Sequence, residues 1–188
     1  AIEVRAFQEA LPSLPKPWLE IGVGSGRFAR ALGIETGLDP STKMLEMAGK
    51  RGITTFPGRG EHLPFDEGVF GSAFLIFVLC FVDSPQDVLK EAHRVLVPSG
   101  KLVLGVCLRE SPWGIFYSQK KNQENRIYKY VNLLKYDKLV KLLEQAGFTI
   151  DKVIPTLFQK PDRVEYMEPP RTGYSAGAGF TVVVAGRK

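Results

Sequence analysis

The stretch Leu19-Glu20-Ile21-Gly22-Val23-Gly24-Ser25-Gly26 decides the fold class that we predict for this chain. Its apolar start is typical of a buried strand, and a helical pattern begins directly after the last glycine. Glycines remove the side chains that would keep a ligand away from the backbone, and the start of a helix offers unpaired N–H groups. The stretch therefore predicts a strand, a ligand-binding loop and a helix in succession.

The spacing of these glycines disagrees with two common phosphate-binding loops. A dinucleotide-binding loop needs glycine or alanine at positions 22, 24 and 27, and position 27 is arginine. A P-loop needs glycine, lysine and serine or threonine at positions 27–29, where this chain has Arg27, Phe28 and Ala29. A nicotinamide oxidoreductase, which we considered as one alternative, is disfavoured for the first reason.

An acid follows the glycine loop at the end of the next predicted strand. Asp39 lies 17 residues after Gly22, where a carboxylate can accept hydrogen bonds from the two hydroxyls of a ribose. A ribose-binding acid beside a loop without basic residues predicts a nucleoside ligand that lacks a pyrophosphate. S-adenosylmethionine is such a ligand. The alternative interpretation is that the glycines only form a tight turn and that Asp39 only starts a helix.

Short apolar runs alternate with helical patterns along the chain, which is typical of a parallel sheet covered by helices. The predicted strands span 18–22, 34–38, 53–56, 74–78, 101–106, 148–154 and 180–185, and the predicted helices span 27–32, 43–50, 86–96 and 137–146. No helix separates the last two strands, so we expect an antiparallel pair. The predicted fold is an α/β, Rossmann-like three-layer sandwich with a seven-stranded, mostly parallel sheet whose last strand is antiparallel.

Five segments carry a resemblance to a known family. They are LEIGVGSGRF (19–28), GLDPSTKMLEMA (37–48), GRGEHLPF (58–65), EAHRVLVPSGKLVLG (91–105) and KLVKLLEQAGF (138–148). Together they resemble the class I S-adenosylmethionine-dependent methyltransferases of type 11, the small-molecule group related to enzymes of ubiquinone and menaquinone biosynthesis. The resemblance covers nearly the whole chain, and it implies an enzyme that converts S-adenosylmethionine to S-adenosylhomocysteine.

The resemblance also implies which residues hold the methyl donor. These are Glu20, Gly22, Gly24 and Gly26 toward the methionine part and the sugar, Asp39 at the ribose, Met44 near the adenine, and Gly60 and Glu61 at the border of the adenine. Pro40 and Phe77 are further candidates for donor binding, and Phe77 packs either in the core or against the adenine. The chain departs from the family at two positions. Arg59 stands where the family often has an acid that receives the adenine amino group, and Gly71 stands where it usually has aspartate after phenylalanine.

The acceptor side is less well defined by the sequence. Methyl transfer from a sulfonium depends mainly on positioning and desolvation, so a base is optional and we assign no catalytic residue. The Asn/Asp-Pro-Pro-aromatic motif of amide and adenine N-methyltransferases is absent after the strand at 74–78.

The candidate pocket residues are Cys80, Arg109, Glu110, Trp113 and Tyr117, and residues 108–134 form a predicted substrate-side insertion. Arg109 and Glu110 form a surface ion pair, or Glu110 holds an amine. The connection at 168–179 is either a lid or a long hairpin loop.

Composition limits the remaining function classes. The chain has 188 residues, is 44% hydrophobic and 24% charged, and carries a net charge of +5, so we expect one domain over 1–188. Its longest apolar run, 73–82, is about half the length that crosses a bilayer. The basic stretch 119–130 is diluted by polar residues, which makes nucleic acid an improbable partner. Two cysteines and two histidines show no ligand spacing, so we expect no metal.

No secretory signal precedes the first strand, so we expect a cytoplasmic protein without membrane segments. Because the chain opens with Ala1, we also expect that an N-terminal segment is missing from it. The predicted function is methyl transfer from S-adenosylmethionine to a small-molecule acceptor in an apolar pocket, by a monomer or a homodimer. The alternatives are a non-catalytic S-adenosylmethionine-binding protein and an RNA methyltransferase.

Overall fold

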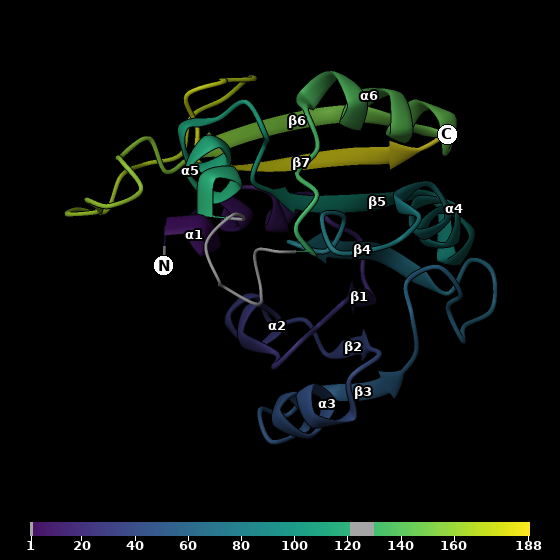
Figure 1. Cartoon of the computed structure of the whole chain (residues 1–188). Coiled ribbons are helices and arrows are strands. Elements are labelled where there is room, and N and C mark those ends of the chain that lie inside the picture. Colours follow the sequence, from purple (N-terminus) through teal and green to yellow (C-terminus); the bar gives the residue numbers. More distant parts are fainter. Residues whose placement is uncertain (1, 121–129) are drawn as a thin grey trace.

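A computed structural model describes residues 2–120 and 130–188 of the chain. The strands are β1 (Trp18–Ile21), β2 (Thr36–Asp39), β3 (Thr54–Pro57), β4 (Phe70–Ile76), β5 (Leu96–Val106), β6 (Phe148–Thr156) and β7 (Phe180–Arg187). The α-helices are α1 (Ile2–Gln8), α2 (Arg27–Leu32), α3 (Thr42–Gly49), α4 (Pro85–Val95), α5 (Pro112–Lys120) and α6 (Tyr136–Gln145), and a short 3-10 helix spans Leu11–Ser13. Figure 1 shows their arrangement.

The strands form one sheet with the order β3-β2-β1-β4-β5-β7-β6. All neighbouring pairs are parallel except β5–β7 and β6–β7, so β7 alone runs against the others. This confirms the predicted seven-stranded sheet and its antiparallel last strand. From β1 the chain first builds β2 and β3 outward on one side and then crosses to β4 on the other. The loops after β1 and β4 therefore diverge, which is where open α/β sheets bind their ligands.

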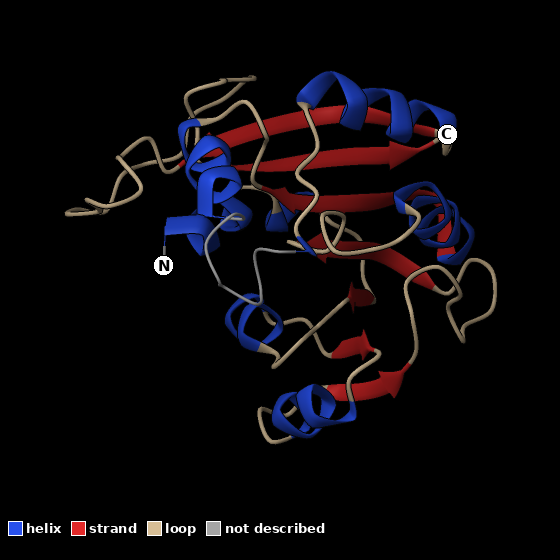
Figure 2. Ribbon diagram, viewed as in Figure 1, coloured by secondary structure: helices blue, strands red, loops and turns tan. Residues whose placement is uncertain are grey.

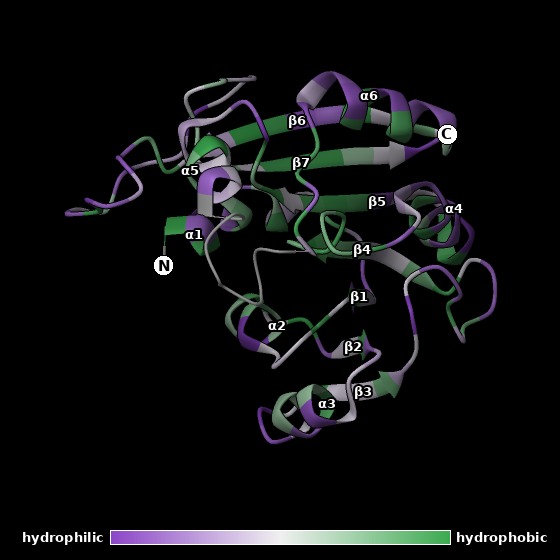
Figure 3. Ribbon diagram, viewed as in Figure 1, coloured by the Kyte–Doolittle hydropathy of each residue, from purple (hydrophilic) through white to green (hydrophobic). Residues whose placement is uncertain are grey.

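Helices cover both faces of the sheet and complete the three predicted layers (Figure 2). On one face, α1, α2 and α3 pack through residues such as Phe7, Ala29 and Leu45. On the other face, α4 and α6 pack through residues such as Leu89 and Leu143. Every residue of β4 is buried, which fits its continuous apolar composition. Figure 3 colours β5 and much of β7 as hydrophobic, whereas the ribbons of α4 and α6 carry both hydrophobic and hydrophilic residues.

The predicted start of the fifth strand at residue 101 was wrong, although residues 98–100, Pro-Ser-Gly, are typical of a turn. β5 already begins at Leu96, which pairs with Phe70, and the register then shifts so that Ser72 pairs with Lys101. The intervening residues bulge out of the ladder, and Ser99 takes a left-handed conformation with φ of 64°. Residues 97–100 therefore interrupt a strand instead of preceding one.

Packing explains why glycine stands at position 71, where the family usually has aspartate. A Cβ atom built on Gly71 would lie 2.5 Å from the carbonyl oxygen of Pro15 and 2.6 Å from that of Lys16. The Gly71 N–H also donates to the carbonyl of Pro17 at 2.9 Å. The segment that leads into β1 thus occupies the space that any side chain at position 71 would need.

Two segments, the insertion at 108–134 and the connection at 168–179, were assigned no helix or strand from the sequence. Within the predicted insertion 108–134, the structure shows α5, whereas most of the basic stretch 119–130 lies outside the described residues. The connection between β6 and β7 returns along the free edge of β6, where Arg171 N donates to Pro155 O and Gly173 N donates to Val153 O, both at 2.9 Å. These bonds cover part of an edge that would otherwise be open to pairing.

Within the described part of the chain, every helix is too short or too polar to span a membrane.

Candidate active site

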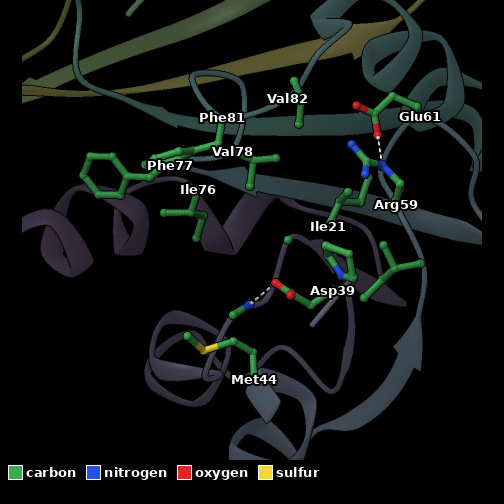
Figure 4. A pocket seen from close by; sticks show the side chains of 15 residues that line it. Ile21, Asp39, Met44, Arg59, Glu61, Ile76, Phe77, Val78, Phe81 and Val82 are labelled. Atoms are coloured by element: carbon green, nitrogen blue, oxygen red, sulfur yellow. Dashed lines mark hydrogen bonds and ion pairs between the residues drawn. The ribbon is translucent and has the colours of Figure 1, made fainter. Parts of the chain in front are cut away.

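A cavity of about 460 Å³ opens beside the ends of β1, β2 and β4, where the chain diverges (Figure 4). Figure 4 shows Asp39 and Met44 on one side of it, Arg59 and Glu61 on another, and Phe77, Val78 and Phe81 opposite. Its full lining is Ile21, Gly22, Gly24, Leu38, Asp39, Pro40, Met44, Arg59, Gly60, Glu61, Ile76, Phe77, Val78, Phe81 and Val82. Eight of the ten residues predicted to hold the donor are in this set, and Glu20 and Gly26 are not.

The three glycines of the loop have different roles in it. Gly22 has φ of 75°, and a Cβ atom there would lie 2.5 Å from Val78 Cγ2. Gly26 also has φ of 75° and precedes α2, where a Cβ atom would lie 3.0 Å from the backbone of Ala48. A Cβ atom on Gly24 would meet nothing within 4 Å. Gly22 and Gly26 therefore allow the loop to fold, whereas the backbone of Gly24 faces open space.

The carboxylate of Asp39 is buried at the end of β2 and fixes the loop. Gly24 N donates to its Oδ2 and Ser41 N donates to its Oδ1, both at 2.9 Å. Ser41 also caps α3, because its hydroxyl accepts from Met44 N at 3.4 Å. Each carboxylate oxygen can accept a second hydrogen bond. Asp39 is thus held rigidly on the cavity wall with acceptor capacity remaining.

Glu20 lies beneath the loop and not on the cavity wall. The residue is 2% exposed, and its Oε2 has no hydrogen-bond partner among the described residues. Burial raises the pKa of Glu20 to about 8, a hydrogen bond from the backbone of Ala29 opposes this shift, and the negative charge of Asp39 adds to it. Glu20 is therefore predominantly protonated at pH 7, directly behind the loop that bears Gly24.

The opposite end of the cavity is polar. Arg59 lies within salt-bridge distance of two acids, with Nε 3.6 Å from Glu61 Oε2 and Nη2 3.1 Å from Asp83 Oδ2. The Arg59 side chain is 63% exposed, so these ion pairs contribute little to stability. Met44 remains 41% exposed at the cavity mouth. Position 59, where the family often has an acid, is thus occupied by an arginine whose guanidinium links the loops after β3 and β4.

A second cavity of about 190 Å³ adjoins the first and shares Phe77 and Phe81 with it. Its lining is Phe77, Cys80, Phe81, Cys107, Tyr117, Val131 and Leu133. Burial raises the pKa of Cys80 to about 12 and that of Cys107 to about 11, so both thiols are protonated at neutral pH. Phe77, where the cavities meet, has a left-handed backbone with φ of 58°. Such strain is characteristic of functional sites.

The structure brings two of the five predicted pocket residues, Cys80 and Tyr117, to this second cavity. Arg109 is exposed and lines neither cavity. Trp113 points elsewhere, because its Nε1 donates to the carbonyl of Gln159 at 2.8 Å. Glu110 accepts from Tyr136 N at 2.9 Å and from the Tyr174 hydroxyl at 3.0 Å. Glu110 therefore joins the start of α6 to the β6–β7 connection.

Sequence reasoning missed several apolar residues of the first cavity. Val78, Phe81 and Val82 follow β4 and line the wall opposite Asp39. Their position in the sequence could have indicated them, because they come soon after the fully buried β4, which pairs with the strand that leads into the glycine loop. No group of three or more histidine, cysteine or acidic side chains in residues 2–120 and 130–188 is arranged to hold a metal ion.

A comparison with known proteins places this geometry in a family. A sequence profile described as a methyltransferase domain matches residues 19–104. The crystal structure of an S-adenosylmethionine-dependent methyltransferase from Thermotoga maritima, described as a possible histamine N-methyltransferase, superposes with a TM-score of 0.91 at 37% identity and covers 99% of this chain and 89% of its own. The chain belongs to the S-adenosylmethionine-dependent methyltransferase family.

Two further relatives of this methyltransferase matter for its function. A protein from Mycobacterium tuberculosis described only as uncharacterised is 37% identical over 186 residues, and the match covers 98% of this chain and 65% of that protein. The chain thus spans about two thirds of the length of its mycobacterial relatives. A demethylmenaquinone methyltransferase from Thermotoga maritima is 28% identical over 173 residues, covering 78% of this chain and 76% of its own.

The first cavity of the methyltransferase fits the donor that the family uses, S-adenosylmethionine. The Gly24 backbone allows close approach of a ligand because no neighbour lies within 4 Å of its Cβ position. Asp39 retains acceptor capacity for ribose hydroxyls. Of the residues that line the cavity, only Arg59 is basic, and it already contacts Glu61 and Asp83. The lining therefore suits a nucleoside without phosphates.

Proposed function

We propose that this methyltransferase transfers a methyl group from S-adenosylmethionine to a small-molecule acceptor, and that the acceptor binds in the second cavity. The observation that carries the proposal is the contiguity of the two cavities, which share Phe77 and Phe81. S-adenosylmethionine, when bound, supplies an electrophilic methyl group on a positively charged sulfur. The chain's own residues then have to align the acceptor with it and keep water out.

The residues of the second cavity suit that task. Aromatic and aliphatic side chains form most of its wall, and the two thiols are protonated. Its described lining holds no carboxylate, imidazole or amine side chain. We therefore assign the rate enhancement to positioning and desolvation, and the acceptor must arrive with a nucleophilic lone pair of its own.

The proposed domain organisation follows from the same cavity. Tyr117, Val131 and Leu133 all come from the insertion at 108–134. We infer that residues 1–188 act as one domain, in which the described parts of this insertion line the acceptor cavity. Both named Thermotoga maritima relatives carry descriptions that refer to small acceptors, histamine and demethylmenaquinone, and this supports a small acceptor here.

The test is methyl transfer from isotopically labelled S-adenosylmethionine to a panel of quinols, aromatic amines, thiols and transfer RNA, read by mass spectrometry. We expect a methylated product from an apolar small molecule and none from RNA. The variant Leu133→Asp, which places a charge in the second cavity, should lower the rate while leaving S-adenosylhomocysteine affinity unchanged. Donor binding without any methylated product would instead support a non-catalytic binder, and methylated RNA would contradict the proposal.

A further inference from the structure

One side chain folds back the connection between β6 and β7, residues 157–179. Gln159 Oε1 accepts from Glu165 N at 2.8 Å and from Tyr166 N at 3.2 Å, and Gln159 Nε2 donates to Tyr166 O at 2.8 Å. A glutamine amide both accepts and donates, so one side chain can bind N–H and C=O groups of the same turn. Gln159 therefore closes residues 159–166 into a loop and fixes its own backbone beneath it.

The two ends of the connection are tied together next to Gln159. Gly179 N donates to Leu157 O at 2.8 Å, and Phe158 N donates to Oε1 of the buried Glu168 at 2.6 Å. Leu157 has a left-handed backbone with φ of 62°, a conformation that persists only where the surroundings hold it. The backbone around Gln159 is thus held on both sides by contacts within the connection.

Helix α5 is anchored to this connection through Trp113. The Nε1 atom of Trp113 donates to Gln159 O at 2.8 Å, and its indole lies against the backbone of Gly179, where a Cβ atom would overlap Trp113 Cδ1. Figure 1 shows α5 beside the ends of β6 and β7 from which the connection runs. One turn further along α5, the ring of Tyr117 packs on Trp113 with centroids 5.9 Å apart. Because Tyr117 lines the second cavity, a continuous series of contacts joins Gln159 to the cavity wall.

We propose that the β6–β7 connection is a brace that sets the shape of the acceptor cavity, and that Gln159 is its positioning residue, acting through Trp113 and Tyr117. This inference rests on the proposed function, which places the acceptor in the second cavity. Without the Gln159 side chain, the carbonyl that accepts from Trp113 is no longer held, and α5 gains freedom to move away from the cavity. None of these three residues lines the first cavity, so the brace should affect the acceptor and leave the donor alone.

The two cysteines of the chain make the cavity wall measurable, because both line the second cavity. Cys107 is 6% exposed, so a thiol reagent such as iodoacetamide reaches it when the wall opens locally. Gln159→Ala and Trp113→Phe should each increase the labelling rate of Cys107 by about five- to tenfold, the factor for one hydrogen bond. Mass spectrometry of the labelled peptides measures this rate. The rate should change little in low urea, because a local opening exposes far less surface than global unfolding does.

A double variant separates the proposed path from two unrelated structural roles. If Gln159 acts through Trp113, the variant with both substitutions should label no faster than the faster single variant, whereas independent effects would multiply. Gln145→Ala at the exposed end of α6 is a matched control for the first change. Trp18→Phe at the start of β1 is a matched control for the second, because its Nε1 has no partner among the described residues. Both controls should label at the wild-type rate, and circular dichroism checks that each variant is folded.

Wild-type labelling of Cys107 in folded Gln159→Ala and Trp113→Phe variants would overturn the brace, and so would factors that multiply in the double variant. The proposed function would stand in either case, because labelling does not depend on methyl transfer. With an acceptor from the panel, Gln159→Ala should raise the KM for that acceptor several-fold and leave the KM for S-adenosylmethionine unchanged. A panel without any acceptor would contradict the proposed function and leave the labelling result as it is, which makes the two failures distinguishable.

Discussion

The two halves of this protein, the proposed donor half around the first cavity and the proposed acceptor half around the second, are built in different ways. The first cavity is formed by short loops that follow β1, β2, β3 and β4, and its polar contacts join residues from adjacent strand ends, such as Gly24 and Asp39. The second cavity takes Tyr117 from α5 and Leu133 from the segment before α6. These elements are held by contacts between segments far apart in the sequence, such as Trp113 with Gln159 and Glu110 with Tyr174. This difference fits the proposal that the first half binds the donor common to the family and the second half binds the acceptor.

We expect the largest effect from Glu20, the buried acid of the donor half, on how the stability of the protein changes with pH. The pKa of Glu20 is raised to about 8 in the folded protein from 4.5, so the folded state retains a proton that the unfolded state releases. Stability should therefore be highest below pH 4.5 as far as this group is concerned, fall as pH rises to about 8, and then level off. At about 1.4 kcal/mol per pKa unit the loss amounts to several kcal/mol.

Urea denaturation at pH 5, 6.5 and 8 measures this loss. The Glu20→Gln variant should show a much weaker decline between pH 5 and 8 than the wild-type protein. Parallel declines in the two proteins would show that Glu20 is not the responsible group.

The second effect concerns the glycine loop. Gly22→Ala should destabilise the protein by about 2–4 kcal/mol, because its Cβ atom would meet Val78 Cγ2 at 2.5 Å in a left-handed backbone. Gly24→Ala, with φ of 50° but nothing within 4 Å, should cost only the strain of about 1–2 kcal/mol. Thermal unfolding of the two variants measures the difference. A Gly24→Ala variant as unstable as Gly22→Ala would contradict the separate roles of the two glycines.

The third effect concerns the ribose contact. Asp39→Ala should weaken S-adenosylhomocysteine binding by about 1–3 kcal/mol, the range for lost hydrogen bonds to a charged group. Isothermal titration calorimetry measures this change, and Asp137→Ala at the start of α6 is a matched control that should keep wild-type affinity. Unchanged affinity in a folded Asp39→Ala variant would remove Asp39 from the ribose site.

The smallest effect belongs to the acceptor half. Tyr174→Phe removes the hydroxyl that donates to Glu110 at 3.0 Å but retains the stacking on Tyr136, whose ring centroid is 4.1 Å away. Stability should fall by about 1 kcal/mol, and S-adenosylhomocysteine affinity should not change. Differential scanning calorimetry with and without the ligand measures both. Weaker donor binding in this variant would mean that the two halves are coupled.

The sequence was enough to bring the glycine loop and Asp39 to one cavity, because its signals there are local. The glycine loop follows β1 and Asp39 ends β2, and the order of strands and helices places both at one edge of the sheet. The bulge at 97–100 was missed because it arises from pairing between β4 and β5, which no local pattern reports.

The sequence could not place the residues around the second cavity, because their contacts are not local. Trp113 and Glu110 have residue types that suit an amine-binding pocket, yet their partners are 46 and 64 positions away along the chain. Periodicity and motif spacing carry no information on such contacts. Cys80 and Tyr117 reach the second cavity because they directly follow β4 or belong to α5, whose places the fold already determines.

The most direct measurement is a nitrogen-15 NMR titration of the protein with S-adenosylhomocysteine, because it observes both halves in one experiment. We predict that the amide signals of Gly22, Gly24, Ser41 and Glu61 shift and saturate together, whereas those of Tyr136 and Tyr174 remain unchanged. Saturable shifts centred on Tyr136 and Tyr174, or no shift at the glycine loop, would contradict the assignment of the first cavity to the methyl donor.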